Sequence, residues 1–250
     1  MIAIFGAFSQ EIIDFKRQMT IEEVVAEPVC KLYRGKFKNR ETLLVQTGMG
    51  KERADNAARF ALEHYPVNAI ISLGFAGGLV PELKIGDVVL CSALLCAPGT
   101  EPKEEKPEPL VPDDNLLSLA SQGAGDRATR FCLGSGVTVL TLDSNRQKMR
   151  ELSETFQAHI VDMESYWIAR IAAAWQIPFI AIRSISDNMQ SSVEPFDQIM
   201  APDGRLLLRK AVFCFISHPQ YLANVFILYR HTRLAKRNLA AVVGQLVSKI

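Results

Sequence analysis

A chain of 250 residues with 48% apolar and 22% charged residues is long enough to bury a large core, which excludes a disordered protein. Its five cysteines are odd in number and form no Cys-x-x-Cys pair, so the sequence argues against a disulfide framework or a zinc site. The first six residues lack the basic start and cleavage site of a signal peptide, and no apolar run approaches the roughly 18 residues that span a bilayer, so we expect a cytoplasmic protein without a transmembrane helix.

Strands and helices are predicted to alternate over the first 190 residues. Short apolar runs predict strands at residues 1–5, 43–46, 69–73 and 178–185, and the first three of them end at a glycine. Helical patterns cover residues 54–64 and 165–175. The alternation predicts an α/β fold with a parallel contribution to its sheet.

In open α/β sheets, ligands bind at the carboxyl ends of the strands. The segments that directly follow the predicted strands are residues 6–11, 47–51, 74–78 and 186–188. Glu11 lies in the first of them, in the first turn of a helix, where a surface carboxylate favoured by the helix dipole is the alternative interpretation. The segments at residues 47–51 and 74–78 are rich in glycine, which allows backbone amides to approach a ligand or simply permits tight turns. They match neither the GxxxxGK[ST] nor the GxGxxG spacing.

Residues 97–112 hold five of the twelve prolines among lysines and glutamates. No sheet interior accommodates that composition, so the segment is predicted to be an exposed loop. It is interpreted either as a solvated connection or as a flap over a functional site.

The glycine segments, together with Val161-Asp162-Met163-Glu164 and Ile185-Ser186-Asp187, resemble in order the purine nucleoside phosphorylase and methylthioadenosine/S-adenosylhomocysteine nucleosidase superfamily. The resemblance runs from residue 1 to about residue 190. It implies a three-layer α/β/α nucleoside phosphorylase-like fold with a mixed central sheet, and an enzyme that cleaves the N-glycosidic bond of a purine nucleoside. No cofactor or metal is expected, because the sequence has no cluster of metal ligands and no dinucleotide-binding fingerprint. Members of the superfamily are commonly dimers or larger, so a homodimer is expected.

The resemblance also implies residue roles. Glu11 matches the carboxylate that activates water, Glu164 the one that binds the ribose hydroxyls, and Asp187 the acid at purine N7, with Ser186 supporting Asp187. These roles suit carboxyl groups, which accept hydrogen bonds from diols, remove protons from water and donate a proton when neutral. Met163 would line the sugar or pack in the core. The pocket lining would comprise Gly74, Phe75, Ala76, Gly77 and Val139.

Two departures from the superfamily pattern bear on the reaction and the substrate. Phosphorylases hold phosphate with arginine and serine side chains at places where this chain has Gln10, Ser72 and Phe75, which favours water as the nucleophile, although Arg53 is an alternative phosphate ligand. Nucleosidases place an aromatic residue against the adenine where this chain has Val139, which indicates a differently shaped substrate.

The chain is divided by prediction into a catalytic domain at residues 1–200 and a basic, amphipathic helical extension at residues 201–250. Residues 204–250 hold eight of the 28 Lys and Arg and none of the 27 Asp and Glu. Helices are predicted at residues 206–217 and 221–247, separated by Pro219. The second helix has an apolar stripe and a basic cluster, and it is expected either to lie on anionic lipid or to pack on the net-negative body. The stripe comprises Leu222, Val225, Phe226, Tyr229 and Leu234, and the basic cluster comprises Arg230, Arg233, Lys236 and Arg237.

The basic tail, the segment Pro202-Asp203-Gly204-Arg205 and the Val-Asp-Met-Glu-Ser variant resemble the hopanoid-associated branch of the superfamily. That resemblance implies release of adenine from adenosylhopane, a lipid-linked nucleoside. The alternatives are a methylthioadenosine/S-adenosylhomocysteine nucleosidase, a phosphate-dependent purine nucleoside phosphorylase, and a noncatalytic nucleoside-binding module. No nucleic acid is expected as a partner, although charge alone permits a basic helix to attract nucleic acid phosphates.

Overall fold

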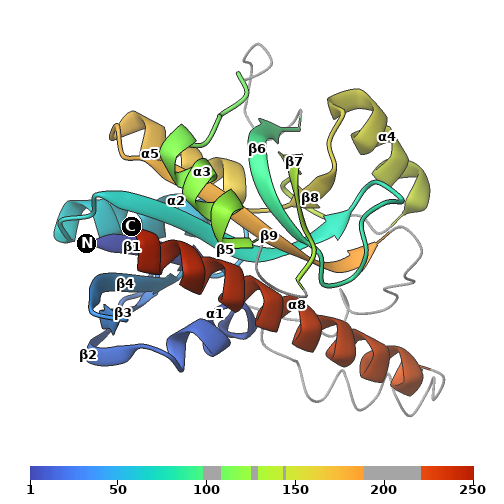
Figure 1. Cartoon of the computed structure of the whole chain (residues 1–250). Coiled ribbons are helices and arrows are strands. Elements are labelled where there is room, and N and C mark those ends of the chain that lie inside the picture. The colour runs from blue at the N-terminus through green and yellow to red at the C-terminus, as the bar shows by residue number, and fades with distance from the viewer. Residues whose placement is uncertain (98–107, 125–128, 143–144, 189–220) are drawn as a thin grey trace.

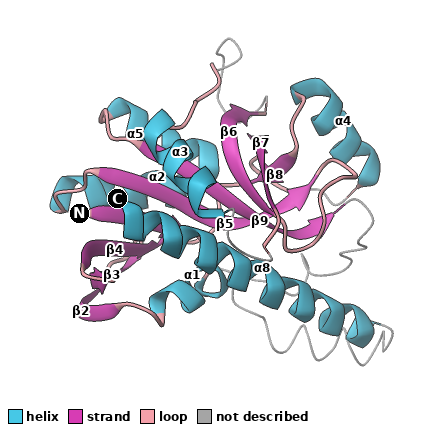
Figure 2. Ribbon diagram, in the orientation of Figure 1, coloured by secondary structure: helices cyan, strands magenta, loops and turns pink. Residues whose placement is uncertain are grey.

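A computed structural model describes residues 1–97, 108–124, 129–142, 145–188 and 221–250. These residues form a mixed nine-stranded sheet covered by helices on both faces (Figures 1 and 2). The strands are β1 (Ile2–Gly6), β2 (Thr20–Ala26), β3 (Lys31–Phe37), β4 (Arg40–Gln46), β5 (Ala69–Gly78), β6 (Val88–Cys96), β7 (Phe131–Thr138), β8 (Ile160–Asp162) and β9 (Phe179–Asn188). The helices are α1 (Ser9–Lys16), α2 (Lys51–His64), α3 (Asp114–Ala124), α4 (Arg146–Phe156), α5 (Ser165–Ala174) and α8 (Tyr221–Lys249).

The sheet has the strand order β2-β3-β4-β1-β5-β8-β7-β6-β9, and β9 also pairs with β5. Strand β1 is parallel to β4 and β5, and β5 is parallel to β9, whereas β9 meets β6 in the antiparallel sense. Because β9 hydrogen-bonds both β5 and β6, the strands from β5 to β9 close on themselves. The predicted mixed sheet is confirmed, and the closure brings the carboxyl-terminal half of β5 against β8 and β9 at once.

Helices cover the two faces of the sheet with separate apolar clusters. One cluster joins α2 and α5 to the sheet through the alanines of α2 and through Trp167 and Ile168 of α5. The other joins α1, α3 and α8 to the opposite face, with Phe15 of α1 and Leu239 of α8 among its fully buried members. The three-layer α/β/α arrangement predicted from the resemblance is therefore confirmed.

Helix α8 lies along the sheet, and the second half of the helix is part of the core (Figure 1). Its buried residues include Ala235, Leu239, Val243 and Leu246, whereas Leu234 lies at the edge of the packed face, 44% exposed and in contact with Gly86. Arg230, Arg233 and Arg237 are exposed. The predicted helix at residues 206–217, the segment 202–205 and residues 98–107 of the proline-rich loop lie outside the described residues.

Two predicted boundaries are wrong in a way that matters for the site. Residues 74–78 are not a turn after a strand, because β5 continues through Gly78 and pairs with β9 along that length. Residues 186–188 likewise belong to β9. Small residues and polar side chains interrupt the apolar runs there, but the ladder continues because both strands have a hydrogen-bonded partner.

Candidate active site

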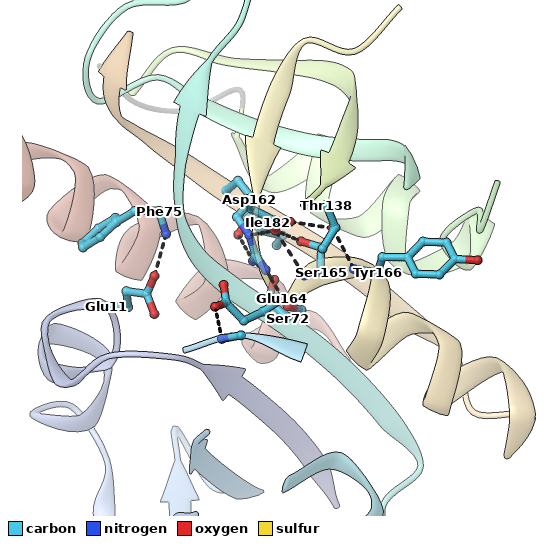
Figure 3. Close-up of polar contacts among 11 residues, drawn as sticks. Glu11, Ser72, Phe75, Thr138, Asp162, Glu164, Ser165, Tyr166 and Ile182 are labelled. Atoms are coloured by element: carbon cyan, nitrogen blue, oxygen red, sulfur yellow. Dashed lines mark hydrogen bonds and ion pairs between the residues drawn. The ribbon is translucent and has the colours of Figure 1, made fainter. Parts of the chain in front are cut away.

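Glu11 is held at the carboxyl end of β1 by two backbone amides. Its Oε2 accepts a hydrogen bond from the Phe8 N–H (2.9 Å), which closes the first turn of α1, and its Oε1 accepts one from the Phe75 N–H of β5 (2.8 Å; Figure 3). The side chain is only 4% exposed. Burial raises the pKa of Glu11, while the two amides and the nearby Arg183 guanidinium oppose that rise.

Gly74 lets the Glu11 carboxylate approach β5. A Cβ at Gly74 would lie 2.9 Å from Glu11 Oε1 and 3.3 Å from Arg183 Cζ, distances that leave no room for a methyl group. The glycine pattern noticed in the sequence thus has a steric reason within a strand, where the backbone itself faces a carboxylate.

Glu164 stands at the junction of β8 and α5, and its Oε1 accepts a hydrogen bond from the Gly50 N–H (2.8 Å; Figure 3). Gly50 precedes α2 with a φ of +93°, which favours glycine and directs its amide toward Glu164. Burial, Asp162 and Glu11 raise the pKa of Glu164 to about 8, against the opposing effects of the Gly50 amide and Arg183. Glu164 and Glu11 therefore lie close enough to repel each other.

Asp187 projects from β9 beside Gly77 of β5, its register partner. A Cβ at Gly77 would lie 3.3 Å from Asp187 Oδ2, and Oδ1 accepts a hydrogen bond from the Ser186 hydroxyl (2.8 Å). Burial raises the pKa of Asp187, and the Ser186 hydrogen bond and the charge of His231 lower it in part. Glu11 and Asp187 thus contact β5 three residues apart, roughly 10 Å along the strand.

A buried ion pair lies beneath the carboxylates. The Arg183 Nε donates to Asp162 Oδ2 (2.7 Å), and its Nη atoms donate to the Ser72 carbonyl and hydroxyl oxygens (2.9 Å each; Figure 3). Arg183 is 2% exposed, so every one of these contacts is shielded from water. The guanidinium is held under Glu11 and Glu164, where its charge favours their ionised forms.

Asp162 is itself fixed by the start of α5. It accepts hydrogen bonds from the Thr138 hydroxyl (2.6 Å) and from the amide and hydroxyl of Ser165, and Thr138 in turn accepts one from the Tyr166 amide (3.1 Å). Together with Arg183, these donors satisfy a buried carboxylate that would otherwise be unstable. The network ties β7, β8, α5 and β9 into one rigid support.

The predicted lining residues divide between the site and the core. Met163 is partly exposed and packs on the apolar cluster that contains Val139, which is 7% exposed. Phe75 is partly buried against the cluster on the α8 side of the sheet, with its ring directed away from Glu164 (Figure 3). Ala76 is buried in the cluster on the α2 and α5 side.

Arg183 and Asp162 are not among the site residues predicted from the sequence. A signal was present, since Arg183 is the only charged residue of the predicted strand at residues 178–185, and a buried arginine requires a partner. The sequence did not reveal that Asp162, 21 residues away, is that partner.

Within the described residues, no group of three or more His, Cys, Asp and Glu is placed to hold a metal ion. No helix in the described part of the chain is both long and apolar enough to cross a membrane.

The fold and the carboxylates gathered at its sheet edge define an α/β enzyme of the purine nucleosidase and nucleoside phosphorylase class. The chain belongs to the phosphorylase superfamily, whose family model matches residues 1–212. It is similar to methylthioadenosine/S-adenosylhomocysteine nucleosidases of Tolumonas auensis (28% identity over 226 residues, 83% of this chain and 96% of the relative) and Haemophilus ducreyi (31% over 198 residues, 74% and 84%).

Solved structures share the fold over the whole chain. A methylthioadenosine/S-adenosylhomocysteine nucleosidase from Neisseria meningitidis, in complex with methylthio-immucillin-A, has a TM-score of 0.80 at 21% identity and covers 100% of this chain and 99% of its own. A futalosine hydrolase of Helicobacter pylori has a TM-score of 0.78 at 18% identity, covering 100% and 97%. The likeness includes α8, so this helix belongs to the shared fold.

Proposed function

We propose that the protein hydrolyses the N-glycosidic bond of a 5′-substituted adenosine, with adenosylhopane as the preferred substrate. The observation that carries the proposal is the gathering of Glu11, Glu164 and Asp187 at one sheet edge, each with a pKa raised by burial. Such shifts concentrate at catalytic sites. The relatives named above are nucleosidases, which supports hydrolysis of the same kind of bond here.

Glu11 acts as the general base in this proposal. Its carboxylate removes a proton from water as the water oxygen attacks the ribose C1′. Two backbone amides fix the carboxylate, and the Arg183 charge beneath it favours its ionised form before reaction. The developing positive charge on the ribose ring is stabilised by the nearby anionic group.

Asp187 acts as the general acid. Its raised pKa favours the protonated carboxyl, which gives its proton to purine N7 while the electron pair of the C1′–N9 bond passes into the purine. Ser186 holds the carboxyl in place (2.8 Å). The water hydroxyl stays on C1′, its proton stays on Glu11, and neutral adenine leaves.

Glu164 binds the ribose hydroxyls in the proposal, because a carboxyl group both accepts from and donates to a diol. The Gly50 amide orients one of its oxygens and leaves the other for the ligand. Met163 lines the sugar, and Gly74, Phe75, Ala76, Gly77 and Val139 line the sugar and base pocket.

Phosphate as the nucleophile is the second candidate, and one observation favours it. The Arg53 side chain folds over Gly48 at the carboxyl end of β4, where its Nη1 lies 3.0 Å from the position of a Gly48 Cβ, and Arg53 is exposed. It is therefore available to an anion. Against this, Gln10 and Phe75 offer no cation, and Arg183 is already engaged by Asp162 and Ser72.

The identity of the 5′ group rests on Val139 and on α8. An aliphatic residue in place of an aromatic one against the adenine indicates a differently shaped substrate. The exposed Arg230, Arg233 and Arg237 suit an anionic membrane surface that would supply a lipid-linked nucleoside. The alternative, a nucleosidase for methylthioadenosine and S-adenosylhomocysteine, is supported by the names of the relatives.

The deciding experiment measures adenine release from adenosylhopane and from methylthioadenosine, each with and without phosphate. Release from the lipid substrate without phosphate supports the proposal. Strict dependence on phosphate would establish the phosphorylase, and turnover of methylthioadenosine alone would establish the alternative nucleosidase. Tight adenosine binding without any release would indicate a noncatalytic binding module.

Replacing Glu11 by Gln tests the base directly. The amide keeps an oxygen for the two backbone donors but removes no proton, so kcat should fall by a factor of about 10³ or more while substrate affinity stays nearly unchanged. Isothermal titration and a turnover assay separate the two effects. Glu63→Gln, an exposed change on α2, should leave both unchanged; full turnover by Glu11→Gln would refute the assignment.

Two further proposals concern assembly. The protein is proposed to form a homodimer, which light scattering would refute by reporting a monomer mass at micromolar concentration.

It is also proposed to bind anionic membranes peripherally through α8. Co-sedimentation with phosphatidylglycerol vesicles should then be lost on replacing Arg230, Arg233 and Arg237 together by Glu, and equal binding to phosphatidylcholine vesicles would contradict the electrostatic contact.

A further inference from the structure

Helix α8 is anchored to the sheet two residues before Asp187. The Gly86 N–H donates to the Ile185 carbonyl oxygen (2.8 Å), and the Gly86 carbonyl oxygen accepts from Asn238 Nδ2 (2.7 Å). The Leu234 side chain also lies against Gly86, with its Cδ2 2.7 Å from the position of a Cβ there. Asn238 and Leu234 therefore fix α8 beside Ile185 of β9.

His231 follows on the same face of α8, three residues before Leu234 and seven before Asn238. The carboxyl end of α8 lies beside the start of β1, so the helix runs opposite to β9 (Figure 1). The two elements therefore lie side by side in opposite directions. Ile185 of β9 lies beside Leu234 of α8, and Asp187 lies toward His231. This packing places the imidazole, which is partly buried, at the Asp187 end of the strand.

The electrostatics of Asp187 agree with that placement, because the charge of His231 lowers the pKa of Asp187. Among the described residues of β9 and α8, the other charged groups are engaged elsewhere or exposed. On β9, Arg183 pairs with Asp162. On α8, Lys236 lies 3.9 Å from Asp14 of α1.

We propose that His231 is a positioning residue for Asp187, whose imidazolium stabilises the carboxylate that forms when Asp187 protonates the departing purine. This inference rests on the proposed function of Asp187. In the step, the Asp187 O–H bond breaks, the purine N7–H bond forms, and Asp187 is left with a negative charge facing the His231 cation. His231 itself neither gains nor loses a proton. Helix α8 is thereby part of the leaving-group site.

The test compares kcat at pH 5.5 and at pH 8.5, two pH values on either side of the ordinary range in which a free imidazole changes charge. His231→Gln should lower kcat about fivefold or more at pH 5.5 and leave it within about twofold of the wild type at pH 8.5. His231→Lys, which keeps a cation, should restore kcat at pH 5.5. His64→Gln, an exposed change on α2, is the control and should have no effect at either pH.

A second readout does not need turnover. The carbon-13 signal of the Asp187 carboxyl, assigned with Asp187→Asn, should titrate at higher pH in His231→Gln than in the wild type or in His231→Lys. His231→Asn is a second neutral variant, should the glutamine variant fold poorly. Equal losses of kcat at both pH values with an unchanged Asp187 titration would overturn the inference. A shifted titration in a protein that releases no purine would refute the proposed function and leave the contact standing.

Discussion

At the residue scale, the site places one buried cation under two carboxylates. Arg183 is neutralised by Asp162, yet its charge still acts on Glu11 and Glu164. The pKa of Glu164 is raised because Asp162 and Glu11 repel its charge in addition to the effect of burial. A pKa of about 8 favours the neutral form of Glu164 at neutral pH.

This balance makes folding stability depend on pH with a definite sign. The pKa of Glu164 is about 8 in the folded protein against an ordinary 4.5, so the folded state binds more protons between those values and stability falls as pH rises through this window. Glu164→Gln removes the ionisation while keeping an acceptor for the Gly50 amide. Its Tm relative to the wild type should rise by roughly 3 °C or more between pH 5 and pH 8. Calorimetry at both pH values measures the difference.

The exposed Glu154→Gln on α4 is the matched control, and its Tm should follow that of the wild type at both pH values. Parallel Tm curves for Glu164→Gln and the wild type would show that Glu164 ionises normally in the folded chain. In that case, repulsion from Asp162 and Glu11 would not govern the site.

At the scale of elements, β5 organises the site. Its first residues pair with β1, and its residues from Ile70 to Gly78 pair with β9. Glu11, which lies on α1 just after β1, and Asp187, which lies on β9, both contact β5. Gly74 and Gly77 are the positions where those carboxylates approach the strand. The spacing between the proposed base and the proposed acid is thus set by strand geometry rather than by a loop.

Gly74→Ala tests this role of β5. The added methyl group would lie 2.9 Å from Glu11 Oε1, against a carboxylate held by two amides, so Glu11 should be displaced and kcat/KM should fall about 10²-fold. Gly136→Ala in β7 is the control: its added Cβ would lie 3.3 Å or more from side-chain atoms of Ile160 and Leu94 and meets no atom of Glu11, so kcat/KM should fall far less. Similar kcat/KM values for the two variants would refute the steric role of Gly74.

The strands that form the centre of the fold could be predicted from the sequence, and their ends could not. Continuous apolar runs identified β1, β5 and β9 because both faces of these strands are buried. The runs stop where Gly74 and Ser186 begin, whereas the hydrogen-bonded ladder continues. Strand ends depend on a partner distant in sequence, and a local pattern contains no information about that partner.

The same limit applies to the site. The ordered motifs singled out Glu11, Glu164 and Asp187 as candidates, because each stands next to a recognisable strand or glycine segment. The support beneath them, Arg183 with Asp162, depends on β8 and β9 being brought together by the closure of the sheet, which no local spacing encodes. The inferred placement of His231 near Asp187 depends in the same way on how α8 packs along the sheet, which the sequence does not show.

At the scale of the whole molecule, α8 closes one face of the protein. Its buried residues share an apolar cluster with β1, β4, α1 and α3, and Gly244 allows the helix to approach the Phe37 ring, with 3.0 Å between that ring and the position of a Cβ. The division into a domain at residues 1–200 and an extension at residues 201–250 stays a prediction from the sequence. The packing of α8 argues that the two parts are not separable.

Deleting residues 221–250 distinguishes these two views. The deletion uncovers the sheet face on which Leu239, Val243 and Leu246 are buried, and an apolar surface of that extent is not stable in water, so the truncated chain should lose its cooperative thermal transition and aggregate. Arg233→Ala, which changes only an exposed charge on α8, should keep the wild-type Tm within about 1 °C. A truncated chain that unfolds cooperatively near the wild-type Tm would instead establish α8 as an appendage, and a role for it in membrane binding alone would then be the stronger interpretation.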